Sequence, residues 1–335
     1  EYAMPSSSIY QCNVYLGLDV VKASDVIYGG YFEHRLLSSA QLSLYHQRMM
    51  LGDCRLETGN YSFPVIARGC MPSDCVCLSL MAYGSEVTRY NMASVSGNEL
   101  LIYPEGAELL YHSDGPARWI NYAIPREMLQ QAIINYSGKS IAISQDRITS
   151  LQLDDGEVEK LIKLTDEIFT SGQTHKQSGV SSRGFTQLSD TLLNSYVAAI
   201  CDAHGVGNLQ AKKSLISQRH NNLILDSEYF VMSHDDMNTS LINIAQRTGY
   251  SLRALELIFR NSVGMPPGKW FLNMRLNGAL RDLLMATANC SVSSIATRWG
   301  FQHLSRFSEQ YRKTFGEYPS HTLVRNRRAF LDTVS

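Results

Sequence analysis

The amino-acid sequence contains one pattern twice, as IAQRTGYSLRALELIF at residues 244–259 and as IATRWGFQHLSRFSEQY at residues 295–311. The segment Ile-Ala-x-Arg-x-Gly opens both copies, at an offset of 51 residues. With one residue inserted, five further positions match at an offset of 52, among them Arg260 with Arg312 and Gly264 with Gly316. Chance is a poor explanation for so many matches in register, so the last third of the chain contains an internal repeat.

Each copy has the pattern of a helix-turn-helix unit. An apolar helix ends at Gly249 or Gly300, where glycine supplies the left-handed backbone of a sharp turn. In the helix that follows, apolar residues recur three or four apart and are expected to be buried together. These inward residues are Leu255, Ile258 and Phe259 in the first copy and Phe307, Gln310 and Tyr311 in the second. We expect the units over residues 241–262 and 292–314, joined by a long helix over residues 267–286 that begins with a proline.

The outward face of each second helix is expected to read DNA. A helix fits the major groove, where arginine bonds guanine, glutamate accepts from cytosine and leucine contacts a thymine methyl group. We expect base contacts from Arg253 and Glu256 in the first copy and from Ser305 and Glu309 in the second. For any one residue, the alternative is an ordinary solvated helix face. The full predicted DNA-binding set is Ser251, Arg253, Glu256, Leu257, Arg260, Ser305, Arg306, Ser308, Glu309, Arg312 and Lys313.

Charge is divided unevenly along the chain. From residue 218 onward there are 14 lysines and arginines against 9 acids, a net charge of +5, whereas the first 217 residues have 16 against 22, a net charge of −6. A basic module that meets a polyanion and an acidic module with another role would have this asymmetry. We therefore expect an N-terminal effector-sensing and dimerisation domain over residues 1–205, a linker over 206–217 and a DNA-binding domain over 218–335.

The first part of the chain is expected to be a β-barrel or sandwich that ends in a helical hairpin, so the predicted fold class is α+β. Short strands separated by turn residues are predicted at residues 42–51, 75–83, 99–103, 107–111 and 119–124. Helical spacing of apolar residues predicts the hairpin at 156–169 and 185–204. The Ser-, Gly- and Thr-rich segment 170–182 between them is expected to be a loop.

Seven cysteines form no C-x2-C pair of the kind that a zinc site favours. Cys75 and Cys77 flank Val76, and the two-residue period of a strand puts both thiols on one face. We expect buried, reduced cysteines, with redox or metal sensing as the alternative, and we expect no metal and no cofactor.

These motifs resemble those of the AraC/XylS family of bacterial transcription regulators. The resemblance covers residues 220–327 and rests on I-A-x-x-x-G-Y-S-x-x-x-L-x-x-x-F (244–259), G-x-x-P (264–267), R-L (275–276), I-A-x-x-x-G-F (295–301) and F-G-x-x-P-S (315–320). The stretch from Gly300 to Phe315 is most similar to the subgroup of ethanolamine-operon regulators. Many family members have a basic residue where this chain has Glu309, so their base preferences do not transfer.

The resemblance implies a cupin-like β-barrel with a helical hairpin as the homodimer contact. It implies double-stranded promoter DNA as the partner and allows RNA polymerase and a small-molecule effector as others. Activator function is expected, with repression as the alternative. Arg55, Arg68, Tyr103 and Arg118 are candidates for an anionic or aromatic effector, with plain barrel surface as the alternative. The alternative function is a regulator controlled by a protein partner or by its abundance.

An enzyme is not expected, because His34, His46 and His112 stand apart and lack the H-x-H spacing of a metal-dependent cupin. No apolar run reaches the roughly 18 residues of a membrane span, and no signal peptide is recognisable. We therefore expect a cytoplasmic protein that is associated with the nucleoid when it is bound to DNA.

Overall fold

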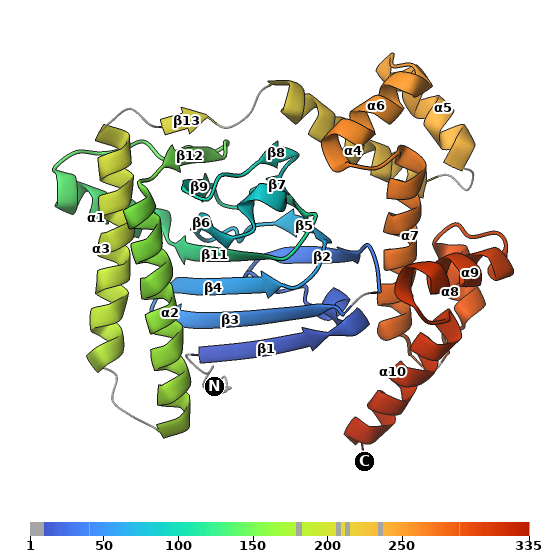
Figure 1. Cartoon of the computed structure of the whole chain (residues 1–335), viewed down its shortest axis with the longest axis horizontal. Helices are drawn as coiled ribbons and strands as arrows, with labels where there is room; N and C mark the ends of the chain where they lie inside the picture. Colours follow the sequence, from blue (N-terminus) through green and yellow to red (C-terminus); the bar gives the residue numbers. More distant parts are fainter. Residues whose placement is uncertain are drawn as a thin grey trace, which may run out of the picture.

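The first half of the chain folds into two antiparallel sheets, in keeping with its short apolar runs (Figure 1). The structure is a computed structural model that describes residues 10–39, 41–178, 183–205, 209–211, 215–233, 237–287 and 289–334. The larger sheet has the order β1 (Tyr10–Leu16), β3 (Ser43–Leu51), β4 (Cys54–Tyr61), β11 (Ala117–Ile124), β6 (Val76–Tyr83), β9 (Glu99–Tyr103), β12 (Thr149–Gln152) and β13 (Leu209–Ala211). The smaller sheet has the order β2 (Tyr31–Leu36), β5 (Val65–Cys70), β10 (Glu108–Ser113), β7 (Thr88–Tyr90) and β8 (Ala93–Ser94).

Three helices cover the larger sheet, and within the described residues seven more follow them in the chain. They are α4 (Leu215–Met232), α5 (Met237–Thr248), α6 (Leu252–Val263), α7 (Pro267–Leu284), α8 (Val292–Arg298), α9 (Leu304–Phe315) and α10 (Pro319–Val334). In Figure 1, α7 runs beside the β-rich part, the pair α5–α6 lies at its upper end, and the pair α8–α9 lies on its side away from the sheets. Strand β13 and the start of α4 lie inside residues 206–217, the expected linker.

Three apolar clusters lie between these layers. One is enclosed by the two sheets and continues through η1 (Gly17–Lys22) into α7 and the second unit, where Leu280 and Phe307 belong to it. A second joins the larger sheet to α1 (Arg126–Ser137), α2 (Asp155–Ser178) and α3 (Arg183–Gly205). A third packs Ile66 and Leu110, on the outer face of the smaller sheet, against α4 to α7. The helices that carry the repeat are therefore packed directly against the β-rich part.

The structure confirms the α+β class and the five predicted strands. It adds the short strands β7, β8, β12 and β13, and also β1, β2, β4 and β5, in which polar or charged residues interrupt the apolar pattern. In β4, for example, Arg55 and Glu57 are both buried. Glu57 is fully buried because it accepts a hydrogen bond from Nε of Arg48 at 2.5 Å, so a paired charge replaces an apolar side chain in the pattern. Cys75 and Cys77 are buried in the core between the sheets, as the period of two predicts.

The predicted loop at residues 170–182 is wrong for its first part, because α2 continues to Ser178. Its backbone passes so close to the larger sheet that a Cβ added at Gly172 would lie 2.0 Å from Cε of Met49 and 3.1 Å from Cβ of Tyr10. The small residues of this segment therefore allow close packing of a helix on β1 and β3, rather than marking a turn. Residues 179–182 lie outside the described part of the chain.

Candidate nucleic-acid interface

The first unit consists of α5 and α6, with Gly249 between them in the left-handed region (φ 74°). Ser251 begins α6 as its N-cap residue, because its hydroxyl accepts a hydrogen bond from the amide of Ala254 at 3.1 Å. The three predicted inward residues of α6, Leu255, Ile258 and Phe259, are buried. The turn and the buried stripe hold α6 across the end of α5 in the manner that the sequence predicts.

The opposite face of α6 is open to solvent. Arg253 and Glu256 are exposed, and Leu257 is 59% exposed although it is apolar. Glu256 forms an ion pair with Arg260, one helical turn later, at 2.9 Å. This face therefore presents an arginine, an acid and an isolated apolar side chain, three groups that can each recognise a different base edge.

The second unit consists of α8 and α9. Ser291 and Ser294 form a capping box that starts α8, and Gly300 (φ 78°) makes the turn. In α9, Phe307 and Tyr311 are fully buried as predicted, but Gln310 is only half-buried. The third buried position is Phe315, because residues four apart continue the stripe of α9 along its axis.

The outward face of α9 carries more charge than that of α6. Ser305, Arg306, Glu309, Arg312 and Lys313 are exposed, whereas Ser308 is half-buried. Nζ of Lys313 lies 2.9 Å from the carboxylate of Glu309, and this hydrogen bond lowers the pKa of Glu309. The acid that departs from the family pattern thus has a cation of its own, one turn along the same helix.

Helix α7 joins the two units and holds the second one closely. Its predicted apolar stripe, which contains Phe271, Met274, Leu280, Leu283 and Leu284, is buried. A Cβ added at Gly278 would lie 2.2 Å from the ring of Trp299, so only glycine lets that ring pack on the helix. Asp282 accepts hydrogen bonds from Nε1 of Trp299 at 2.9 Å and from Arg298 at 3.0 Å, which adds a polar contact between α7 and the end of α8.

Arg275 of α7 links α4 to the turn of the second unit. It is buried, and its Nη2 donates to the carbonyl of Val231 in α4 at 2.8 Å. A Cβ added at Gly300 would lie 3.2 Å from its Cζ atom. The sequence analysis had this arginine only as part of the R-L motif and assigned it no contact. Its contacts with Val231 and Gly300 explain why a long cationic side chain is buried in an otherwise apolar part of α7.

The four candidate effector residues do not share one site. Arg55 and Tyr103 are buried, because their strand positions point inward. Arg55 pairs with Asp74 at 2.8 Å, and Arg118 pairs with Asp166 at 2.6 Å on the side covered by α2. Arg68 contacts Glu228 of α4 instead. The four residues therefore lie at separate places, and Arg68 lies between the β-rich part and the helices.

A small cavity of about 30 Å³ lies inside the β-rich part, walled mainly by apolar and aromatic side chains that include Tyr61, Tyr90, Tyr111 and Trp119. One enclosed water molecule needs roughly 10–15 Å³ on this measure, so the cavity has room for a few waters. An effector of drug-like size would have to displace these rings to enter. Within the described residues, no helix is long and apolar enough to cross a membrane.

Comparison with known proteins agrees with this geometry. Residues 244–325 match the model of a helix-turn-helix domain family. The probable thc operon regulatory protein of Rhodococcus erythropolis is 37% identical over 95 residues, 28% of this chain and 29% of that protein. This chain thus spans less than a third of that relative. XylDLEGF operon transcriptional activator 2 of Pseudomonas putida is 33% identical over 105 residues, 31% of this chain and 67% of that protein.

Among solved structures, the AraC-like transcriptional activator CuxR aligns with 86% of this chain and 100% of its own, at 13% identity and a TM-score of 0.37. Because that score is low, the fold assignment depends on the strands and helices described above. The similarity to ethanolamine-operon regulators stays a prediction.

Proposed function

The chain belongs to the AraC/XylS family of transcription regulators, and we propose that it binds promoter DNA sequence-specifically and controls transcription there. One observation carries this proposal: two helix-turn-helix units lie on one continuous helix, and each has an exposed recognition face. Two recognition helices on one arm suit successive major grooves about 34 Å apart, or a bent duplex where their spacing is shorter. The proposed activity is binding, in which residues 218–335 form the DNA-binding part.

In this proposal α6 and α9 each enter a major groove. Arg253 and Glu256 from α6, and Ser305 and Glu309 from α9, contact base edges. Leu257 contacts a thymine methyl group, while Arg306 and Ser308 line the side of the groove. The turn amides, Arg312, Lys313 and Lys269 contact phosphates and set the register.

The two acid–base pairs supply a mechanism for an acid in a polyanionic groove. In the free protein, Arg260 neutralises Glu256 and Lys313 neutralises Glu309. Both pairs are exposed to solvent, so separating them costs little. On DNA each cation is free to turn to a phosphate while each carboxylate accepts a hydrogen bond from a cytosine amine.

The β-rich part is proposed to control this binding. We propose a homodimer through α2 and α3, contact with RNA polymerase, and a small-molecule effector that acts on the N-terminal part, in a protein that activates transcription in the cytoplasm. The names of the Pseudomonas relatives, which are operon transcriptional activators, support the direction of control. A thermal-shift screen of the full chain with metabolites tests the effector, because a ligand that binds only the folded state raises its melting temperature.

The proposed function is tested by selection of bound fragments from a random-sequence duplex library with the full chain. We expect enrichment of one bipartite sequence whose halves lie roughly one helical turn apart. Its affinity should fall by about a thousandfold or more between 50 and 200 mM salt, since several phosphates are neutralised. A library that shows no enrichment, or binding that does not depend on salt, would contradict the proposal.

A further inference from the structure

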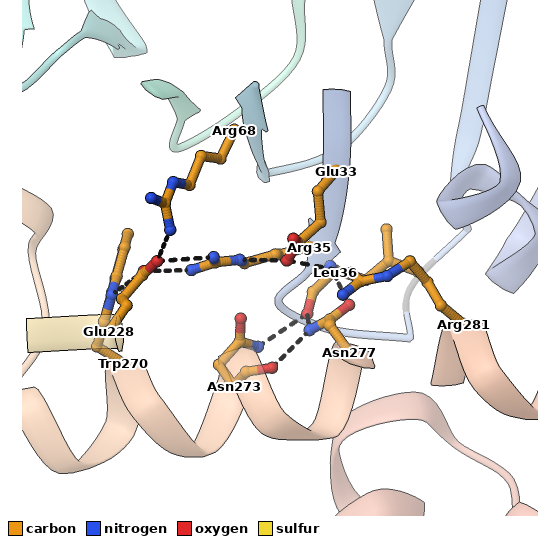
Figure 2. Close-up of polar contacts among 9 residues, drawn as sticks. All are labelled: Glu33, Arg35, Leu36, Arg68, Glu228, Trp270, Asn273, Asn277 and Arg281. Atoms are coloured by element: carbon orange, nitrogen blue, oxygen red, sulfur yellow. Dashed lines mark hydrogen bonds and ion pairs between the residues drawn. The ribbon is translucent and has the colours of Figure 1, made fainter. Parts of the chain in front are cut away.

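The β-rich part is attached to the helices of the first unit by a buried cluster of charges (Figure 2). Arg35 of β2 donates two hydrogen bonds to Glu228 of α4, at 2.6 and 3.1 Å, and both side chains are almost fully buried. Arg68 of β5 and Nε1 of Trp270 in α7 donate to the same carboxylate, the latter at 2.8 Å. Although burial disfavours the charged form of Arg35, Glu228 outweighs it and raises the pKa of Arg35. One carboxylate therefore joins two strands to two helices.

The same strand is also attached to the middle of α7. The backbone amide of Leu36 donates to Oδ1 of Asn277 at 2.7 Å, and its carbonyl accepts from Asn273 at 2.9 Å and from Asn277 at 3.0 Å. One turn further along α7, Arg281 lies 3.1 Å from Glu33. Figure 2 shows these contacts in a row along the helix that joins the two units. We name the nine residues drawn there (Glu33, Arg35, Leu36, Arg68, Glu228, Trp270, Asn273, Asn277 and Arg281) the strand–helix contact.

Two further contacts lie at matching positions of the repeat. Arg89 reaches the end of α6, where its Nη1 lies 3.5 Å from the carbonyl of Ser262 and its Nη2 lies 3.6 Å from the place of a Cβ on Gly264. A cation here suits the negative end of the helix dipole. At the end of α9, a Cβ on Gly316 would lie 3.1 Å from Cβ of Ser39. The β-rich part thus touches the last turn of both recognition helices.

None of these contacts covers the described recognition faces. With the strand–helix contact formed, Arg260 is 56%, Glu309 59% and Lys313 67% exposed at the side chain. A contact that blocked DNA would bury these groups. The β-rich part instead contacts α4, α7 and the C-terminal ends of α6 and α9, and the recognition faces of α6 and α9 stay exposed.

We propose that the strand–helix contact positions the two recognition helices for simultaneous binding, with Asn277 and Glu228 as its positioning residues. This inference rests on the proposed DNA-binding function. Holding α4, α7 and the ends of α6 and α9 against one rigid sheet removes freedom that DNA binding would otherwise have to remove, and such preorganisation increases affinity. It also determines the separation of the two helices, so the β-rich part is a determinant of half-site spacing although it does not touch DNA.

Asn277→Ala in the full chain is the first test. Among the described residues, the side chain of Asn277 hydrogen-bonds the backbone of Leu36 and of Asn273 in its own helix. Alanine favours a helix, so α7 itself should be preserved. Hydrogen exchange at the Leu36 amide reports whether the contact has loosened. Arg68→Gln is the second variant and removes a bond to Glu228 in the same strand–helix contact. The Arg68 side chain is 23% exposed, so its replacement should disturb the fold less than that of a fully buried residue. Arg126→Gln is the matched control, an arginine bound to Glu105 and to the carbonyls of Ile143 and Ser144, with no bond to the described C-terminal helices.

The probe is a duplex selected with the wild-type chain, together with copies in which one to five base pairs are inserted between its halves, up to roughly half a helical turn. We expect Asn277→Ala and Arg68→Gln to speed exchange at Leu36 and to weaken binding to the selected duplex about tenfold. The penalty for an altered spacing should shrink in both variants, whereas Arg126→Gln should match the wild type. The change in spacing penalty separates positioning from a loss of folded protein, which would weaken binding to every duplex equally.

Three results would overturn the inference. Faster exchange at Leu36 with unchanged affinity and spacing penalty would show that the contact has no part in DNA reading. Tighter binding by the variants would show that it inhibits. If the wild type selects no sequence, the proposed function itself is wrong, and the inference that depends on it is rejected as well.

Discussion

The guanidinium group of Arg35 and the carboxylate of Glu228 lie 193 residues apart in the chain and form a two-point ion pair that is almost sealed from solvent. Taking both charges out of water is costly, and the pair offsets this cost only while its geometry is complete. Arg68 and Trp270 satisfy the remaining capacity of the carboxylate. Loss of one partner therefore leaves a buried charge that is only partly compensated.

Arg35→Met should lower the free energy of unfolding of the full chain by about 3 kcal/mol or more, because Glu228 loses its main partner while it stays buried. Urea denaturation measures this change. The control is Arg147→Met, in which an exposed arginine beside Asp146 is replaced, and which should change stability by less than about 1 kcal/mol. Equal effects of the two substitutions would show that the buried pair contributes no more to the free energy of unfolding than an exposed pair does.

Arg253→Ala should weaken binding to the selected DNA by about 1–3 kcal/mol and relax the preference at one base pair, as expected for a lost base contact. Arg253 is exposed and lies near the start of α6, so its removal should leave the fold intact. Binding titrations with the selected duplex and with its single-base variants measure both effects. If random DNA weakens by the same factor as the selected duplex, Arg253 contacts a phosphate rather than a base.

Gly278→Ala should destabilise the chain by about 1–3 kcal/mol, even though alanine favours helices, because the new methyl group overlaps the Trp299 ring. Gly268→Ala in the same helix is the matched control, since a Cβ there meets nothing within 4 Å. The control should be neutral or stabilising by up to about 1 kcal/mol. Thermal denaturation distinguishes the two, and a tolerated Gly278→Ala would show that α8 can move away from α7 without cost.

Stability should fall as the pH falls from about 6.5 towards 4. Burial lowers the pKa of His34 to about 4, and the ring keeps a 2.6 Å hydrogen bond to the hydroxyl of Tyr61. In this window the unfolded chain holds a proton that the folded chain does not, so each such histidine adds a slope of about 1.36 kcal/mol per pH unit. Its contribution is complete above the unfolded pKa and is lost as the pH falls through the folded one.

His34→Gln should reduce the slope of the free energy of unfolding against pH by the contribution of one proton, as measured by urea denaturation between pH 7 and 4. His204→Gln, which alters an exposed side chain, is the control and should leave the slope as it is. The same slope in wild type and His34→Gln would show that His34 does not titrate on unfolding. Because burial also lowers the pKa of His46 and of His112 to about 4, part of the pH dependence should remain in the variant.

The local sequence pattern was sufficient to predict the helices and turns of each repeat unit. The glycines at 249 and 300, the buried stripe of α6 and the apolar stripe of α7 were all predictable, because each depends on spacing within one helix or one turn. Except for Ser308, which is half-buried, the residues expected to face solvent on α6 and α9 followed from the same spacing. Gln310 was placed wrongly because the stripe of α9 shifts along the helix axis to Phe315.

Contacts between residues that are distant in the sequence could not be predicted from local pattern. Nothing near Glu228 in the sequence indicates a partner in β2, and Asn277 in α7 resembles any polar residue of a helix until the backbone of Leu36 is placed against it. The ion pairs of the candidate effector residues Arg55 and Arg118 were not predictable for the same reason, since their partners Asp74 and Asp166 come from other elements.

The sequence by itself determined that this protein has two helix-turn-helix units on one arm, because helix periodicity and glycine turns are local properties of the chain. Only the tertiary structure decided how those units are held. The cost of burying a charged group is offset when partners distant in sequence surround it, and the attachment of α4 and α7 to the β-rich part depends on such partners.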